Sequence, residues 1–544
     1  MFTVLALGGC GGGGGSPTPV SQPPDPPEPD PEPVITVPPS SAEERFSGGD
    51  ASTTVNGNDE AFGQAPRAIQ QAFALDANFK LGNAIFRNDH SGEGPLLNAR
   101  TCQGCHTKDG RGRTPPDTTT PMDTMSIRLG LGVDENDTTI PDSTYGVLLQ
   151  VFGLASFSGG DISVGLSVFG EGGGDAIGEG FGLVEYEEVP GSFDDGEPYS
   201  LRRPIYKVRE LSYGDFDTGI QFSPRVAPQV FGLGLLGAVS DETILAYADP
   251  DDGDGDGISG RAAVIVDNTT GETRVGRFGV KATVASILQQ TSGAYRADMG
   301  VTSSFAPEEP CTAAQVSCQQ IAAMEPNMHP GGVDLADIEL ALVEFYVRTL
   351  AVPQRRGFDE ETETWDDDVL SGRTIFFEAG CEQCHRQRMT TSSAVGSVLG
   401  EVDLNVLVPD APPIDVLSNQ TIYPYTDLLL HDMGGQCDTI VPETAEGEPC
   451  GAGNNCIWVQ RCEGLADGRP EGQASGSEWR TAPLWGLGLV ETVNPNATYL
   501  HDGRARTIAE AILWHGGEAT DSRDAFLALD VEARDDLLTF LESL

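Results

Sequence analysis

The sequence contains few basic side chains and no long apolar run. Lys and Arg number 32 against 83 Asp and Glu, so the formal net charge is -51. This charge repels phosphate backbones and anionic lipid headgroups, which argues against nucleic acid as a partner. Cations, basic electron carriers and small neutral substrates stay open, and the simplest interpretation of the charge is a solvated acidic surface. Because no run of 18 apolar residues occurs, we expect no membrane-spanning helix.

Glycine and proline are frequent. Their 68 and 37 residues together make up about 19% of the chain, against about 12% in average proteins. Many segments must therefore run in turns and loops, and long helical repeats or coiled coils are not expected. Hydrophobic residues make up 38% before Gly is counted, which allows a buried core and excludes wholesale disorder. At about 150 residues per domain, the 544 residues suggest two to four domains.

The first 44 residues resemble a lipoprotein leader followed by a tether. Met1 to Cys10 is a short apolar stretch that ends in Leu-Gly-Gly-Cys, and Gly-rich and Pro-rich acidic segments follow. We therefore expect a periplasmic or cell-surface protein of a Gram-negative bacterium, held at the outer membrane only through a lipid anchor at Cys10. A basic segment before the apolar stretch is missing, so the alternatives are a truncated start or an accidental likeness.

The remaining chain divides into two units. In the first unit, residues 45–353, apolar periodicity predicts helices near 79–86 and 335–350. Alternating apolar and polar residues with repeated Gly over about 145–215 predict a β-hairpin insertion in the same unit. The second unit, residues 354–544, contains a Cys-rich insertion at 435–465 and closes with a helix near its C-terminus.

Each unit contains one Cys-x-x-Cys-His motif. The motifs are formed by Cys102, Cys105 and His106 in the first unit and by Cys381, Cys384 and His385 in the second. Two thiols followed directly by His form the attachment motif of c-type haem, in which the thiols bind the vinyl groups and the His is presented to iron. The alternatives are a four-cysteine zinc site or two disulfides, although neither needs the histidines. The sequence thus predicts two covalently bound c-type haems.

Six cysteines remain besides Cys10 and the motif cysteines: Cys311, Cys318, Cys437, Cys450, Cys456 and Cys462. An even number in an exported chain predicts three disulfides. We expect Cys311 to pair with Cys318 and the other four to pair among themselves, in one of three ways. Since no Cys-x-x-Cys occurs among these six, we interpret them as structural cysteines.

An acidic loop at 249–260 places carboxylates at alternate positions. Asp252, Asp254 and Asp256 alternate with Gly, which is the pattern that wraps a hard cation such as Ca2+. The bidentate Glu expected at the twelfth position is replaced by Ala263. The loop therefore predicts a Ca2+ site, with an acidic surface turn as the alternative.

Beyond these motifs, further segments carry a resemblance to a known family: CQGCHTKDGRGR (102–113), RVAPQVFGLGLL (225–236), GISGR (257–261), GRFGVKA (276–282), DMG (298–300), YTDLLLHDMG (425–434), EWRTAPLWGLG (478–488) and LHDGRARTIAEAILWHGGEA (500–519). Through these segments, the chain from about Phe79 to Leu544 resembles the bacterial di-haem oxidoreductases, a family described as peroxidases or thiol oxidoreductases. The family is distantly related to di-haem cytochrome c peroxidases and MauG-type enzymes. Val280 stands where these relatives usually have Trp.

The resemblance implies a mainly α fold with two cytochrome c-like haem domains and a β-hairpin insertion in the N-terminal half. It also implies an oxidoreductase of peroxidase type, in which one haem relays electrons and the other opens an axial position for peroxide. The partners would be a small electron donor, either a cytochrome or a cupredoxin, and a small-molecule oxidant. The alternatives are an electron-transfer protein with two six-coordinate irons and a surface binding or assembly protein with vestigial haems.

For the C-terminal haem, the resemblance implies His385 and His515 as axial ligands, with Arg480 and His501 lining the site. His515 follows an amphipathic segment at 508–514, and His501 is the second candidate ligand. His431 is either a buried hydrogen-bonded residue or a haem contact.

For the N-terminal haem, the resemblance implies His106 as proximal ligand, with a distal position that is vacant or weakly occupied. Gln290 would hold the substrate and Asp298 would transfer a proton between the peroxide oxygens. Met299 is an alternative ligand in a resting form, and the alternative for Asp298 is a cap of a helix or turn. We expect the two remaining histidines, His90 and His329, to be solvated.

Overall fold

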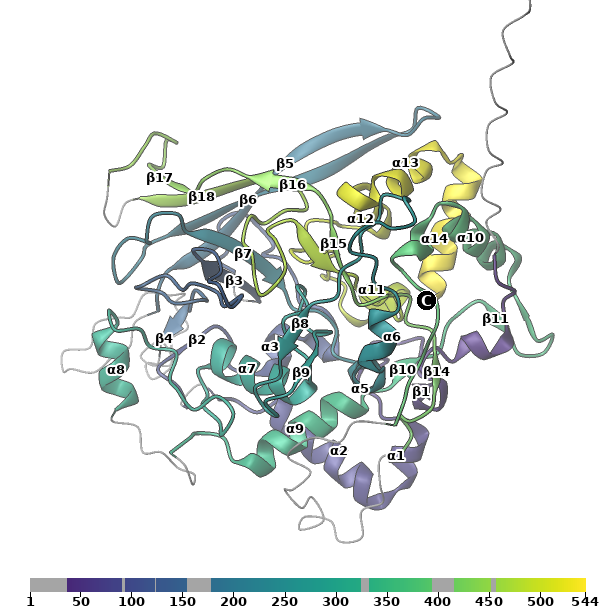
Figure 1. Ribbon diagram of the computed structural model, residues 1–544, viewed down its shortest axis with the longest axis horizontal. Coiled ribbons are helices and arrows are strands. Elements are labelled where there is room, and N and C mark those ends of the chain that lie inside the picture. Colours follow the sequence, from purple (N-terminus) through teal and green to yellow (C-terminus); the bar gives the residue numbers. More distant parts are fainter. Residues whose placement is uncertain are drawn as a thin grey trace, which may run out of the picture. The chain divides into compact units, whose positions relative to one another are not determined.

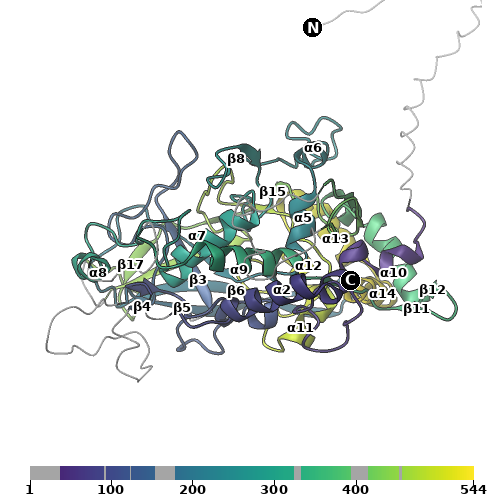
Figure 2. The same cartoon turned by 90° about the horizontal axis from the view of Figure 1, so that it is seen from below.

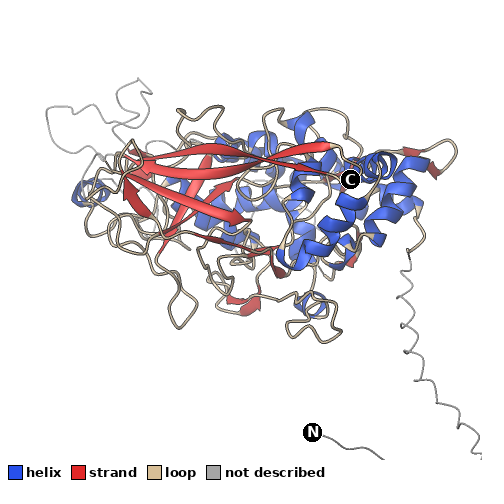
Figure 3. Cartoon of the chain, turned by 90° about the horizontal axis from the view of Figure 1, so that it is seen from above, coloured by secondary structure: helices blue, strands red, loops and turns tan. Residues whose placement is uncertain are grey.

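The computed structural model describes residues 37–90, 93–122, 124–153, 178–323, 332–393, 415–451 and 456–544 (Figure 1). Cys10 with most of the expected leader, His329, and residues 154–177 of the expected β insertion lie outside the described residues. The expectation of a mainly α fold is wrong, because 29% of the described residues are helical and 22% lie in strands and bridges that form many small sheets, and these residues do not show two cytochrome c-like domains. Figure 3 shows these strands beside the helices.

The helices are short, as the high Gly and Pro content predicts. Among the described residues, none is long and apolar enough to cross a bilayer. The segments expected to be helical, near 79–86, 335–350 and 508–514 and near the C-terminus, do form helices. The helices are α1 (Arg67–Gln71), α2 (Phe73–Phe86), α3 (Cys102–Cys105), α5 (Leu233–Ala238), α6 (Asp241–Leu245), α7 (Ile287–Met299), α8 (Val316–Ala322), α9 (Asp337–Thr349), α10 (Asp367–Glu378), α11 (Val490–Val493), α12 (Ile508–Leu513), α13 (Thr520–Ala528) and α14 (Val531–Ser543).

Two helix pairs repeat one packing arrangement. The helix that precedes each Cys-x-x-Cys-His motif crosses a later helix, α2 against α9 and α10 against α14 (Figure 1). A Cβ at Gly82 of α2 would lie 2.1 Å from the Leu342 carbonyl oxygen, and one at Gly372 of α10 would lie 1.8 Å from that of Asp536. Because only Gly permits this approach, the internal glycines set how closely each motif helix packs on its partner.

Most strands are two or three residues long, and the exceptions are two strand pairs and β18, which has eight residues. β5 and β6 form a long antiparallel hairpin, and β3 pairs with β7. The strands are β1 (Ser52–Thr53), β2 (Leu96–Leu97), β3 (Met125–Gly130), β4 (Phe152–Gly153), β5 (Phe181–Ser192), β6 (Pro198–Arg209), β7 (Gln221–Val226), β8 (Val264–Val266), β9 (Thr273–Val275), β10 (Val352–Pro353), β11 (Phe358–Asp359), β12 (Thr364–Trp365), β13 (Met389–Thr390), β14 (Thr421–Ile422), β15 (Leu430–Asp432), β16 (Gly435–Cys437), β17 (Val441–Glu443), β18 (Ile457–Gly464) and β19 (Glu478–Arg480).

The largest sheet joins the two expected insertions. Its strands run in the order β16-β18-β6-β5, and β17 also pairs with β18. In the antiparallel pair of β18 with β6, Trp458 lies opposite Val208 and Arg461 opposite Ile205. The hairpin of the first half and the Cys-rich segment of the second half therefore build one sheet, which explains much of the strand content that local patterns did not predict.

The hydrophobic cores also combine distant segments. The largest cluster contains Phe79 of α2 and Tyr346 of α9, whose rings lie 4.8 Å apart, together with Trp485 from the C-terminal half. A second cluster joins the C-terminal helices to the tip of the β5–β6 hairpin, where the Phe193 and Phe526 rings lie 5.7 Å apart. The division into units at residue 353 stays a prediction.

Candidate functional site

The first motif lies on the one-turn helix α3. The Thr101 hydroxyl caps this helix by accepting a hydrogen bond of 2.9 Å from the Gly104 N–H. His106 follows directly, and its Nδ1 lies 2.6 Å from the Pro228 carbonyl oxygen. Because a carbonyl only accepts, Nδ1 carries the proton and Nε2 keeps its lone pair. Burial lowers the pKa of His106, so the ring is neutral, as a metal ligand must be.

The second motif follows α10 and is held in the same manner. Gly380, at φ 75°, turns the chain into the motif, and His385 Nδ1 donates to the Tyr425 carbonyl oxygen at 3.0 Å. Burial lowers the pKa of His385 to about 4, and the nearby His515 contributes in the same direction. Tyr425 has φ 53°, a left-handed conformation that is uncommon for a bulky residue.

His515 directly follows the segment expected to be helical, which forms α12. Its Nδ1 donates to the Ala511 carbonyl oxygen at 2.8 Å, so it too keeps a lone pair on Nε2. Burial lowers the pKa of His515. Three histidines therefore share one arrangement, with the proton tied to a backbone carbonyl and the other nitrogen able to bind a metal.

His501 differs from these three. Its ring stacks on the Trp479 ring, with centroids 3.6 Å apart and planes inclined by 14°, and burial lowers its pKa to about 4. The Lys281 ammonium lies 4.4 Å from the Trp479 ring centroid. This cation is itself held by the Asp467 carboxylate at 3.0 Å and by two backbone carbonyls.

His431 is buried and hydrogen-bonded, as the first of its two interpretations from the sequence describes. Its Nε2 lies 2.9 Å from Asp427 Oδ2, and its Nδ1 lies 2.7 Å from Glu518 Oε2. Burial opposes its charge, but hydrogen bonds with Asp427, Cys384 and Glu518 outweigh burial and raise the pKa of His431 to about 12. With both nitrogens engaged, His431 is not available as a metal ligand.

A cavity of about 510 Å³ brings the two motifs together. Every haem-site and catalytic residue expected from the sequence lines this cavity, and His431, Met299 and Trp479 also contribute to its wall. These expected residues are Cys102, Cys105, His106, Gln290, Asp298, Cys381, Cys384, His385, Arg480, His501 and His515.

The cavity wall is basic although the chain is acidic. Six arginines line it, Arg111, Arg128, Arg225, Arg277, Arg480 and Arg523, whereas Asp298 is the only carboxylate among the lining residues of the described chain. Arg111 donates to the backbone carbonyls of Thr498 and Leu500, and Arg480 to those of Gly279 and Thr481. Neither guanidinium forms an ion pair with a described carboxylate, so the wall suits an anionic ligand.

Of these six arginines, the sequence resemblance pointed only to Arg480 as a site residue. Four of the six lie within the segments that carry the family resemblance, which was the available signal. Arg128 and Arg523 lie outside those segments and reach the wall only through folding. The Nε of Arg128 is buried and has no hydrogen-bond partner among the described residues.

Gln290 and Asp298 both lie on α7, near opposite ends of that helix. The Asp298 carboxylate lies 3.8 Å from Arg128 Nη2, and both side chains are partly exposed. Its backbone carbonyl accepts from the N–H groups of Asn98 and Ala99. Met299, the last residue of α7, belongs to the hydrophobic core as well as the cavity wall.

The six other cysteines form three disulfides, and none of them involves a motif cysteine. The bonds join Cys311 with Cys318, Cys437 with Cys462 and Cys450 with Cys456. The expected pairing of the first two is confirmed, and the structure selects one of the three pairings left open. Within the described residues the motif cysteines do not gather into one cluster of metal-ligating atoms, which excludes the four-cysteine zinc site there.

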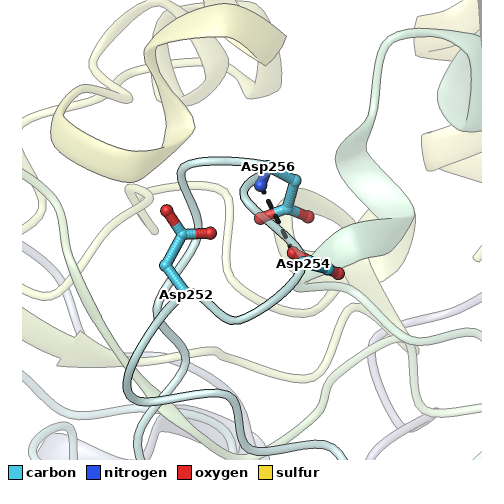
Figure 4. Close-up of side chains that lie close together, drawn as sticks. All are labelled: Asp252, Asp254 and Asp256. Atoms are coloured by element: carbon cyan, nitrogen blue, oxygen red, sulfur yellow. Dashed lines mark hydrogen bonds between the residues drawn. The ribbon is translucent and has the colours of Figure 1, made fainter.

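Figure 4 shows the three carboxylates along the acidic loop, where the Asp256 N–H donates to Asp254 Oδ1 at 3.3 Å. Ligand atoms of Asp252, Asp254 and Asp256 lie within 4.8 Å of one another. Burial raises the pKa of Asp256, and the neighbouring Asp254 and Asp252 charges add to this rise. Figure 2 shows this loop near α6, on the same side as β8.

His90 is not solvated, contrary to expectation. It is 2% exposed, because the Tyr295 ring covers it edge-on at 5.3 Å. Its Nδ1 lies 2.6 Å from Glu93 Oε2. A polar sequence neighbourhood therefore did not indicate exposure, since the covering ring comes from α7.

A family model described as "Di-haem oxidoreductase, putative peroxidase" matches residues 44–448 and 455–544. No curated protein matches the chain. Among solved structures, hydrazine synthase of Kuenenia stuttgartiensis pressurised with 20 bar xenon matches at 15% identity and a TM-score of 0.22. That match covers 43% of this chain and 63% of the other.

Proposed function

The chain belongs to the family of di-haem oxidoreductases, and on that premise we propose that it is an exported c-type cytochrome that reduces a small oxidant of the peroxide class. The observation that carries this proposal is one cavity whose wall contains both Cys-x-x-Cys-His motifs. Two further observations support this proposal. Three histidines keep an imidazole lone pair for a metal, and two arginines of the cavity wall form no ion pair with a described carboxylate.

The residues present fit two haems. Each cysteine pair offers two thiols outside the disulfide network, and His106, His385 and His515 each offer an imidazole nitrogen with a lone pair. Arg111 and Arg480, which donate to backbone carbonyls and form no ion pair with a described carboxylate, would neutralise the propionate groups of the haems. When bound, each haem supplies an iron that changes its charge by one electron and offers axial positions.

Asp298 and Gln290 would then act on the oxidant. Asp298 takes a proton from one peroxide oxygen and returns it to the other, while Gln290 donates a hydrogen bond that holds the molecule. Each hydrogen peroxide consumes two electrons and two protons and yields two waters. The electrons would come from a small cytochrome or cupredoxin. The partial exposure of Asp298 supports proton exchange with solvent.

We place this protein in the periplasm or at the cell surface, with a lipid anchor at Cys10. The three disulfides support this placement, because such bonds persist in oxidising compartments. The mass of the mature N-terminal peptide tests the anchor. A processed Cys10 that carries acyl chains supports it, whereas an intact Met1 without lipid refutes it.

We further propose that the acidic loop binds Ca2+. Three carboxylates supply part of the six to eight oxygens that Ca2+ takes, and water and backbone carbonyls would complete the set. Titration with Ca2+ should raise the unfolding temperature of the wild type but not of Asp254→Asn. A rise of equal size in both proteins, or in neither, would refute this site.

The main experiment is expression in a host that matures c-type cytochromes. Two covalent haems should appear in the protein mass, Cys102→Ala and Cys381→Ala should each remove one, and peroxide should be consumed with an artificial reductant. An unmodified wild-type mass would refute haem attachment.

One observation favours the second candidate function, pure electron transfer. Met299 lies in the cavity wall, and its thioether would be able to bind the iron of a haem held there. If the oxidised protein binds neither cyanide nor peroxide, electron transfer without substrate reduction is the correct function.

A further inference from the structure

His431 links the segment that follows Tyr425 to the segment that follows His515 through its contacts with Asp427 and Glu518. It lies on β15, which pairs antiparallel with β19 so that His431 faces Trp479 in the register. The side chain is 3% exposed and bonds to Asp427 on one nitrogen and Glu518 on the other. Cys384 Sγ lies 3.6 Å from its Nδ1.

The two carboxylates specify the protonation state of this ring. A carboxylate oxygen accepts hydrogen bonds, so an imidazole flanked by carboxylates on both nitrogens must carry both protons. His431 is therefore a cation between two anions, and such charge-assisted bonds are stronger than neutral ones. A Cβ at Gly260 would lie 2.8 Å from His431 Cε1, so the neighbouring chain covers the ring closely.

Glu518 connects His431 to the segment that contains His515. Glu518 lies three residues after His515, in the 3-10 turn η8 (Gly517–Ala519). A Cβ at Gly517 would lie 2.1 Å from the Asp432 carbonyl oxygen, so the backbones of the two segments touch. Glu518 Oε1 also accepts from Ser259 Oγ at 2.9 Å.

Asp427 connects His431 to the segment that orients His385. Asp427 lies two residues after Tyr425, whose carbonyl oxygen accepts the Nδ1 proton of His385. Asp427 is 1% exposed, and its Oδ1 accepts from the Leu429 N–H at 2.9 Å. His431 thus connects the segment that orients His385 with the segment that contains His515.

We propose that His431 is a positioning residue that, through Glu518, holds His515 in place, so that His515 together with His385 would bind the C-terminal haem iron. We call the hydrogen-bonded group of Asp427, His431 and Glu518 the clamp. The identity of His515 as a ligand rests on the proposed function, whereas the contacts of the clamp are properties of the chain itself. His431 cannot act as ligand or proton carrier while both of its nitrogens are engaged, so its contribution is geometric.

Two variants open the clamp from different sides. Glu518→Gln keeps the shape of the side chain and removes its charge, and His431→Gln removes the cation. Ser259→Ala is the matched control, because it removes the other polar side-chain partner of Glu518 and leaves the bond to His431 intact. All three should be studied as the full chain with its haems, with thermal unfolding followed to confirm folding.

Amide hydrogen exchange of residues 515–519 and the spin state of the ferric haems are the two measurements. In both clamp variants we expect exchange about tenfold faster or more, since a hydrogen bond to a charged group is lost. One of the two haems should also change from low spin to high spin with haem content unchanged. The control should stay within about twofold of the wild type, and the double variant should match the single ones.

The outcomes separate the clamp from the proposed function. If both variants exchange at the wild-type rate and keep their spin state, the clamp is refuted while the haem function stands. If effects of the two substitutions add fully, the residues act independently and the clamp is also refuted. A wild type without haem would refute the proposed function, and exchange at 515–519 would still decide the clamp.

Discussion

Replacing Asp298 with Asn tests whether this carboxylate transfers a proton or only supports the fold. The substitution keeps the shape of the side chain and removes its ability to accept a proton. We expect peroxide turnover to fall about 10²-fold or more, which corresponds to about 2.7 kcal/mol in activation free energy. Haem content should not change.

The structure limits what the loss of an ion pair alone would do. Asp298 lies 3.8 Å from Arg128 Nη2, with side chains 31% and 25% exposed. Ion pairs with such access to solvent contribute at most about 1 kcal/mol, which corresponds to about a fivefold effect. A loss of about 10²-fold therefore exceeds what a structural ion pair explains.

The assay is steady-state peroxide consumption with an artificial reductant, combined with haem quantification and thermal unfolding. Arg128→Gln is the matched control, because it breaks the same ion pair and leaves the carboxylate. We expect this control to lose no more than about fivefold. If Asp298→Asn also stays within fivefold, or the two variants lose activity equally, the proton-transfer role is wrong.

Three further predictions concern disulfides, pH and ligation. Removing Cys437 and Cys462 together should cost about 3.5 kcal/mol of unfolding free energy, because their disulfide closes a loop of 25 residues. Removing either of the other two disulfides, whose cysteines are six or seven residues apart, should cost about 2.3 kcal/mol. Equal losses in denaturant titrations would contradict the loop-length argument. The pKa of His431 is raised from 6.5 to about 12, so its stabilising charge is fully present below pH 6.5. Above pH 6.5, the difference in unfolding free energy between the wild type and His431→Gln should fall by up to about 1.4 kcal/mol per pH unit. A difference that stays constant with pH would show that this residue does not titrate as argued. His515→Ala should convert one haem to high spin, and an unchanged low-spin spectrum would move the assignment to His501.

Covalent and local features were predictable from the sequence. The two Cys-x-x-Cys-His motifs indicate their chemistry through five consecutive residues each, and the even number of remaining cysteines indicated disulfides. The helices near 79–86 and 335–350 formed as α2 and α9, because apolar periodicity acts between residues one turn apart. The internal glycine of each motif helix was also visible, although its role in close helix packing was not.

The fold class and the selection of partners needed the tertiary structure. β6 and β18 pair across about 250 residues, and no local pattern specifies such a partner, so the mainly α expectation failed. The same sheet register places Cys437 opposite Cys462 and thereby selects their disulfide from the three possible pairings.

The roles of the histidines were decided in the same way. His385 and His431 both lie beside polar and apolar residues in sequence, yet one faces a carbonyl and keeps a lone pair while the other lies between two carboxylates. The sequence predicts which groups would attach haem, because this covalent chemistry depends on adjacent residues. Only folding decided which histidines can bind a metal, because that depends on acceptors brought from distant parts of the chain.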